Sequence, residues 1–153
     1  MSLQRDSAAT VARVPLDGQP FRMAALTMPA DKDYLALARL ATMHVAGLLG
    51  LPIGHLTDLR LAVNEACALL LNAPAGHGAA GEGALELSFE RCPDHLRVTV
   101  RGPAPERRPD TEDIGWLVLR ALVNEVSMEI TGATATLTLI ETLPARWKPG
   151  YGS

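Results

Sequence analysis

Glu65 is the side chain of this sequence whose position most calls for a chemical explanation. It follows Asn64 in the segment 57–72, TDLRLAVNEACALLLN, where apolar residues recur at spacings of three and four. This spacing predicts an amphipathic helix with Glu65 near the edge of its buried stripe. A carboxylate there either serves a function, or is solvated, or is satisfied by a neighbouring element. The segment alone leaves these alternatives open.

The histidines and cysteines form no recognisable metal-binding motif. The histidines are scattered without an HExxH or CxxC partner, and two cysteines give neither a disulfide framework nor a metal spacing. We therefore predict no metal site built from these side chains and, from the cysteine usage, a cytoplasmic protein. The residues concerned are His44, His55, His77, His95, Cys67 and Cys92.

Length and composition fit one domain with a single core, since the chain has 153 residues, of which 48% are hydrophobic. The net charge of −3 comes from 14 basic and 17 acidic residues that are interspersed, which disfavours direct DNA binding. The sequence shows no apolar run of membrane-spanning length and no signal peptide. The preference for Arg, Ala, Gly and Pro suggests a GC-rich bacterial genome.

The elements needed to position Glu65 follow in the order β-α-α-β-β-α-β-β. Alternating apolar residues predict strands, helical spacing predicts helices, and clusters rich in Gly or Pro predict the loops between them. We expect strands at 20–29, 84–92, 96–101, 126–130 and 134–143, and helices from just after Asp31 to Gly50, at about 55–72 and at 114–126.

Each expected helix and strand has a single apolar side. The fold class is therefore α+β, a two-layer sandwich of a mixed or antiparallel sheet with three helices on one face. We expect a flexible N-terminal arm at 1–19, the folded domain at 20–143 and a C-terminal tail at 144–153.

Two motifs in this order, DLRLAVNEAC at 58–67 and LVLRALVNEV at 117–126, carry a family resemblance. The chain resembles the anti-sigma-factor serine kinases of the RsbW and SpoIIAB type, which belong to the GHKL superfamily with its histidine-kinase-like Bergerat ATPase fold. The likeness covers about residues 20–143. It implies a homodimer that binds a sigma factor and a STAS-domain anti-anti-sigma factor.

The resemblance also implies a catalytic site, in which Glu65 would be the general base if kinase activity survives. The family carries an Asn four residues later that coordinates magnesium, and Leu69 stands there instead. Asn72 lies about two helical turns beyond Glu65 and is the candidate to replace that ligand.

The nucleotide contacts of the family are altered as well. Arg101 or Gly102 falls where an Asp would accept a hydrogen bond from adenine, and neither side chain can accept one. Gly115 remains from the phosphate-binding turn, whereas Asp113 adds negative charge and Trp116 adds bulk. We therefore expect nucleotide binding to be weak or lost, with no cofactor; ATP and Mg²⁺ would be required only by an active kinase.

The partner-binding residues implied by the family lie on the first helix. Arg39 matches an Arg that both partners share, and Arg suits this role because its fork can pair with carboxylates. Leu35 and Met43, one helical turn to either side, would add apolar contacts. Alternatively, Arg39 is an ordinary exposed Arg, and Leu35 and Met43 belong to the core.

Three functions follow as hypotheses. The first is a regulator that sequesters its partner by protein binding without phosphorylation. The second is an ATP-dependent serine/threonine kinase that phosphorylates an anti-anti-sigma factor, with Glu65 as base. The third is a scaffold that has lost both its ligand and its partners.

Overall fold

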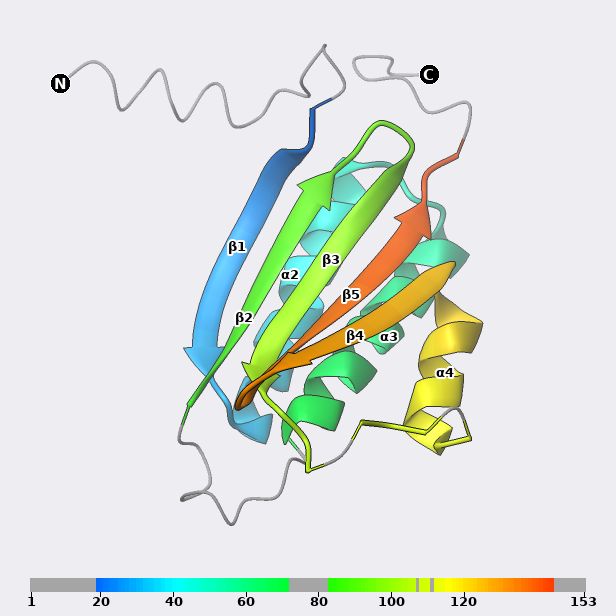
Figure 1. Ribbon diagram of the computed structural model, residues 1–153. Helices are drawn as coiled ribbons and strands as arrows, with labels where there is room; N and C mark the ends of the chain where they lie inside the picture. The colour runs from blue at the N-terminus through cyan, green and yellow to red at the C-terminus, as the bar shows by residue number, and fades with distance from the viewer. Residues whose placement is uncertain (1–18, 72–82, 107, 111, 145–153) are drawn as a thin grey trace, which may run out of the picture.

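The computed structural model describes residues 19–71, 83–106, 108–110 and 112–144. Its elements are β1 (Phe21–Pro29), a 3-10 turn η1 (Lys32–Tyr34), α2 (Leu35–Leu48), α3 (Ile53–Leu71), β2 (Ala84–Arg91), β3 (His95–Pro103), α4 (Ile114–Leu122), β4 (Glu125–Thr131) and β5 (Thr134–Thr142). Helices α2 and α3 lie behind one five-stranded sheet, and α4 lies beside α3, next to β4 (Figure 1). The predicted α+β sandwich is confirmed.

The sheet is antiparallel throughout, with the strand order β1-β2-β3-β5-β4. Side chains alternate across it, as the period of a strand requires. On β3, Val98 and Val100 are buried beneath the helices while Arg97 and Arg101 lie on the opposite face. The sheet thus has one apolar face for the helices and one polar, solvated face.

Local signals start and stop the helices that cover the apolar face. Asp31 accepts a hydrogen bond from the backbone N–H of Asp33 at 2.8 Å and so caps the η1 turn that leads into α2. Gly50, with a φ of 71°, reverses the chain after α2 at no steric cost. On α3 the buried side chains are Leu59, Ala62, Val63, Ala66, Cys67 and Leu70, which keep the predicted helical spacing.

The prediction that the last helix continues to residue 126 is wrong. The α4 helix ends at Leu122, and Val123 is already extended, with φ −130° and ψ 166°. Asn124 then donates its backbone N–H to the Ile140 carbonyl, and Glu125 pairs with Ile140 in the sheet. Pairing with β5 satisfies more backbone groups than one further helical turn, so the sheet captures this segment despite its helical spacing.

Within the described residues, no helix is both long and apolar enough to cross a membrane.

Candidate functional site

Helices α3 and α4 bring together the residues that a catalytic site would use. If Gly115 carried a Cβ atom, the Glu65 Oε2 would lie 3.4 Å and the Leu69 Cδ2 3.1 Å from it. Glu65 is half-buried, and its carboxylate makes no hydrogen bond within the described part of the chain. Its carboxylate and the Leu69 methyl groups therefore face the first turn of α4 side by side.

The end of β3 shows which residue faces the helices at the expected adenine position. Gly102 is buried on the helix side, where an added Cβ would lie 2.5 Å from Leu85 Cδ2 and 3.3 Å from Leu70 Cδ1. Arg101 points to the other face, where its Nη1 donates to the Glu86 Oε1 at 3.1 Å. This pair borders an open hollow of about 430 Å³. Leucine side chains therefore pack against Gly102, and the hollow lies on the face away from Glu65.

The start of α4 is not capped by the side chain that precedes it. Asp113 occupies the N-cap position, but its Oδ2 accepts from the backbone N–H of Asp110 at 2.7 Å and makes no cap hydrogen bond. Its carboxylate thus lies beside the first turn of α4. Trp116, half-buried, packs against the hydrophobic core.

Arg39 is held in place by a contact between α2 and α3. Its Nη1 donates to the Asn64 Oδ1 at 2.6 Å, and both side chains are half-buried at the solvent border of the two helices. Because Asn64 occupies one guanidinium nitrogen, the other donors of the fork remain available to a partner. Asn64, the hydrogen-bond partner of Arg39, lies 25 residues away on another helix, and sequence reasoning did not connect the two residues.

The remaining predicted site residues have different surroundings. Leu35 is partly buried and packs against the core, whereas Met43 is 37% exposed and contacts Arg60. Asn72 lies outside the described residues, as do the predicted N-terminal arm up to residue 18 and the tail from 145. The roles assigned to Arg39, Leu35 and Met43 stay predictions.

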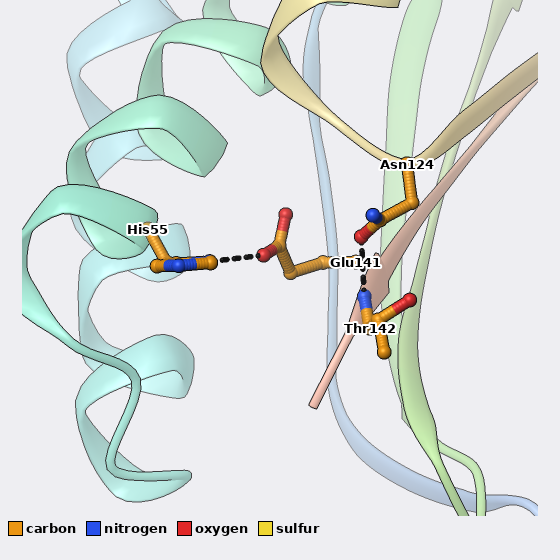
Figure 2. A network of polar contacts seen from close by, with 4 residues as sticks. All are labelled: His55, Asn124, Glu141 and Thr142. Atoms are coloured by element: carbon orange, nitrogen blue, oxygen red, sulfur yellow. Dashed lines mark hydrogen bonds and ion pairs between the residues drawn. The ribbon is translucent and has the colours of Figure 1, made fainter. Parts of the chain in front are cut away.

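A buried acid on β5 was missed by sequence reasoning. Glu141 is 3% exposed, and its Oε2 accepts a hydrogen bond from the His55 Nδ1 in the first turn of α3 at 2.9 Å. Figure 2 shows this pair, with Asn124 accepting from the backbone N–H of Thr142 beside it at 2.7 Å. The signal lay in the alternation of β5, where Leu137, Leu139 and Glu141 all face inward. The pair ties the start of α3 to the sheet.

We expect the substitution His55→Ala to lower the free energy of unfolding by about 1–2 kcal/mol at pH 7, because it leaves a buried carboxylate without its partner. Burial raises the pKa of Glu141 above its ordinary 4.5, and nearby Asp58 acts in the same direction, while His55 opposes both. A raised folded-state pKa means that the contribution of Glu141 to stability is greatest below pH 4.5 and falls as pH rises through the folded value. The decrease in the free energy of unfolding caused by His55→Ala should therefore become larger as pH rises.

Urea denaturation between about pH 4 and 8 measures this effect. His95→Ala is the matched control, because the partner of His95 is Asp94, whose side chain is 86% exposed. An exposed pair contributes less than about 1 kcal/mol. Equal losses in the two variants at every pH would contradict the assignment.

Cys67 is a structural side chain. It is fully buried on α3, and burial raises the pKa of its thiol to about 12, so almost no reactive thiolate forms at neutral pH. Among the described residues, no three His, Cys, Asp or Glu side chains gather in a way that could hold a metal ion.

Comparisons with known proteins identify the fold and the family. The family model of the histidine kinase-like ATPase domain matches residues 28–140. Among solved structures, the crystal structure of the RsbU and RsbW domains of Rv1364c from Mycobacterium tuberculosis is similar, with a TM-score of 0.63 and 17% identity. The match covers 84% of this chain and 33% of that one, so this chain spans about a third of that chain's length. At this identity the likeness shows the fold alone.

The comparison with curated proteins found no match. The family model nevertheless spans most of the sandwich, from the end of β1 to within β5. The chain therefore belongs to the family of histidine kinase-like ATPase domains.

Proposed function

We propose that this protein is an anti-sigma regulatory factor that sequesters a sigma factor, or binds its STAS-domain antagonist, by protein–protein contact. The observation that carries the proposal is the 2.6 Å hydrogen bond that fixes Arg39 on the solvent border of α2. A guanidinium held in advance loses less conformational entropy when it binds a carboxylate. The proposed regulator acts in the cytoplasm, and we expect it to be a homodimer.

The proposal includes weak or lost nucleotide binding, which the residues around Gly102 and Gly115 support. Leu69 offers no oxygen to magnesium and packs toward Gly115. Gly102 has no side-chain acceptor for an adenine amino group, and Leu70 and Leu85 close over it. Positioning and charge neutralisation supply most of phosphoryl-transfer catalysis, so the groups present do not fit ATP·Mg²⁺. No kinase step is therefore assigned to this chain.

One observation favours the alternative of an ATP-dependent serine/threonine protein kinase. The Glu65 carboxylate faces Gly115 at the start of α4, which is the arrangement that a general base beside a phosphate-binding turn requires. Under this alternative ATP and Mg²⁺ would be bound, Asn72 would supply a metal ligand, and an anti-anti-sigma factor would be the substrate.

Calorimetric titration with ADP and magnesium separates the two functions. We expect no detectable heat and no rise in melting temperature, because both the metal ligand and the adenine acceptor are missing. Gly115→Val is the matched control, since it blocks the turn without touching α2. A dissociation constant in the micromolar range that is lost in Gly115→Val would favour the kinase.

The regulatory role is tested with purified partners. Each sigma factor and each STAS-domain protein of the host is expressed and titrated against the full chain by biolayer interferometry, and light scattering after size exclusion gives the oligomeric state. At least one partner should bind with a dissociation constant of about a micromolar or below. Failure of every sigma factor and STAS protein to bind would refute the proposed function.

A further inference from the structure

Arg60, on α3, is a second arginine that has no charged partner among the residues that the structure describes. It is half-buried, its Nε is shielded from solvent, and this atom has no hydrogen-bond partner within the described structure. Its Nη1 makes only a long contact to the Met43 sulfur, at 4.0 Å. Sulfur is a weak acceptor, so this contact does not compensate for desolvating the guanidinium.

Arg39 and Arg60 lie on the two sides of the α2–α3 contact. Arg39 reaches across to Asn64 on α3, and Arg60 reaches across to Met43 on α2. Neither forms an ion pair with a described carboxylate, unlike Arg97 and Arg101 of β3, which pair with glutamates at 2.8 and 3.1 Å. The α2 sequence also contains no acidic residue. The α3 helix carries Asp58 and Glu65, but among the described residues neither carboxylate pairs with Arg39 or Arg60. The two guanidinium groups therefore have no ion-pair partner in the described structure.

Apolar side chains accompany the two arginines. Leu40 follows Arg39 and is 62% exposed, and Leu61 follows Arg60 and is 45% exposed. Met43, at 37%, lies beside Arg60. Methionine and arginine are enriched at protein-binding surfaces, and arginine is among the residues that contribute most to binding there. Together Arg39, Leu40, Met43, Arg60, Leu61 and Asn64 are named here the α2–α3 surface.

The geometry points to one docking surface that spans both helices and takes an amphipathic, acidic helix of the partner, with Arg60 as its second charged contact. This inference rests on the proposed function and extends it from α2 to α3. A helix is the occupant because it packs between two helices through ridges and grooves, whereas this surface offers no strand edge. Carboxylates on the docked helix pair with Arg39 and Arg60, and its apolar residues cover Leu40 and Leu61.

The test uses whichever purified sigma factor or STAS-domain protein binds the wild-type chain. Arg60→Met should weaken binding about tenfold and Arg60→Glu about thirtyfold, because each leaves a partner carboxylate unpaired or repelled. Arg120→Glu is the matched control, as Arg120 is exposed on α4, away from this surface. Arg60→Met should also reduce the salt dependence of the dissociation constant.

A stability measurement separates binding from a structural role. Because the Arg60 Nε is buried without a partner, Arg60→Met should melt at the wild-type temperature or above it. In the partner, a Lys substitution at the acidic residue that meets Arg60 should restore tight binding to Arg60→Glu.

Three results would count against the inference. If the wild type binds and Arg60→Glu binds as tightly as Arg120→Glu, the two-helix surface is refuted while the proposed function stands. A lowered melting temperature in Arg60→Met that accounts for its weaker binding would refute it too. If no sigma factor or STAS protein binds the wild type, both the inference and the proposed function fail.

Discussion

Arg39→Glu is expected to weaken binding of the sigma factor or STAS protein by at least about a hundredfold, which is about 2.7 kcal/mol of binding free energy. The substitution removes a guanidinium that Asn64 holds at 2.6 Å and places a carboxylate where the partner is expected to present its own. Loss of a charge-assisted contact and like-charge repulsion act in the same direction. Biolayer interferometry gives the dissociation constant at low and at physiological salt, and thus the combined effect of the lost contact and the repulsion.

Two further variants make this test specific. Arg120→Glu changes the net charge equally but lies on exposed α4, so it should change affinity by less than about threefold. Asn64→Ala leaves Arg39 in the chain but removes the hydrogen bond that holds its guanidinium in place. It should therefore weaken binding less than Arg39→Glu does. If wild type and Arg39→Glu bind the partner with equal affinity, Arg39 does not belong to the interface, even if a sigma factor is bound.

Gly102→Val is expected to lower the free energy of unfolding by about 3 kcal/mol, as overpacking of a core does. The new Cβ would lie 2.5 Å from Leu85 Cδ2 and 3.3 Å from Leu70 Cδ1, and both leucines are fully buried, so neither can swing into solvent. Chemical denaturation with urea gives the change directly. The same loss would show that leucines, rather than space for a ligand, lie against this glycine.

Gly47→Ala serves as the matched control for this substitution. Gly47 is inside α2, and a Cβ there meets nothing within 4 Å, so alanine should stabilise the chain by up to about 0.5–1 kcal/mol through its better helix propensity. If Gly102→Val were as stable as the wild type, the packing around Gly102 would be loose enough to admit a ligand, and the expected loss of nucleotide binding would need another cause.

Most of the fold could be predicted because its signals are local. The alternation of Leu85, Leu87 and Phe89, and the glycine turn at Gly132, fix the hairpins without tertiary information. The end of α4 could not be predicted, since residues 123–126 keep a helical spacing and only pairing of Glu125 with Ile140 makes them sheet.

The candidate site was predictable only where a family motif marked it. The resemblance pointed to Glu65, Leu69 and Gly115, and the structure brings these three together. The contacts of Arg39 with Asn64 and of His55 with Glu141 join residues 25 and 86 positions apart. Such pairs depend on how α3 lies against α2 and the sheet, which no spacing within one element reveals. Of these four residues, only Glu141 could have been recognised from the sequence as needing a buried partner, because it is an acidic residue at an inward-facing position of β5.

The position of β1 at the edge of the sheet affects how partner capture would depend on the cellular level of the protein. This strand forms one border of the sheet, and only residues 30–34 join it to the helix that carries Arg39. A second subunit that paired with the outer edge of β1 and so extended the sheet would restrict the motion of that helix. Self-association and partner capture would then reinforce each other, and the amount of captured partner would rise more steeply than in proportion to the cellular level of the protein.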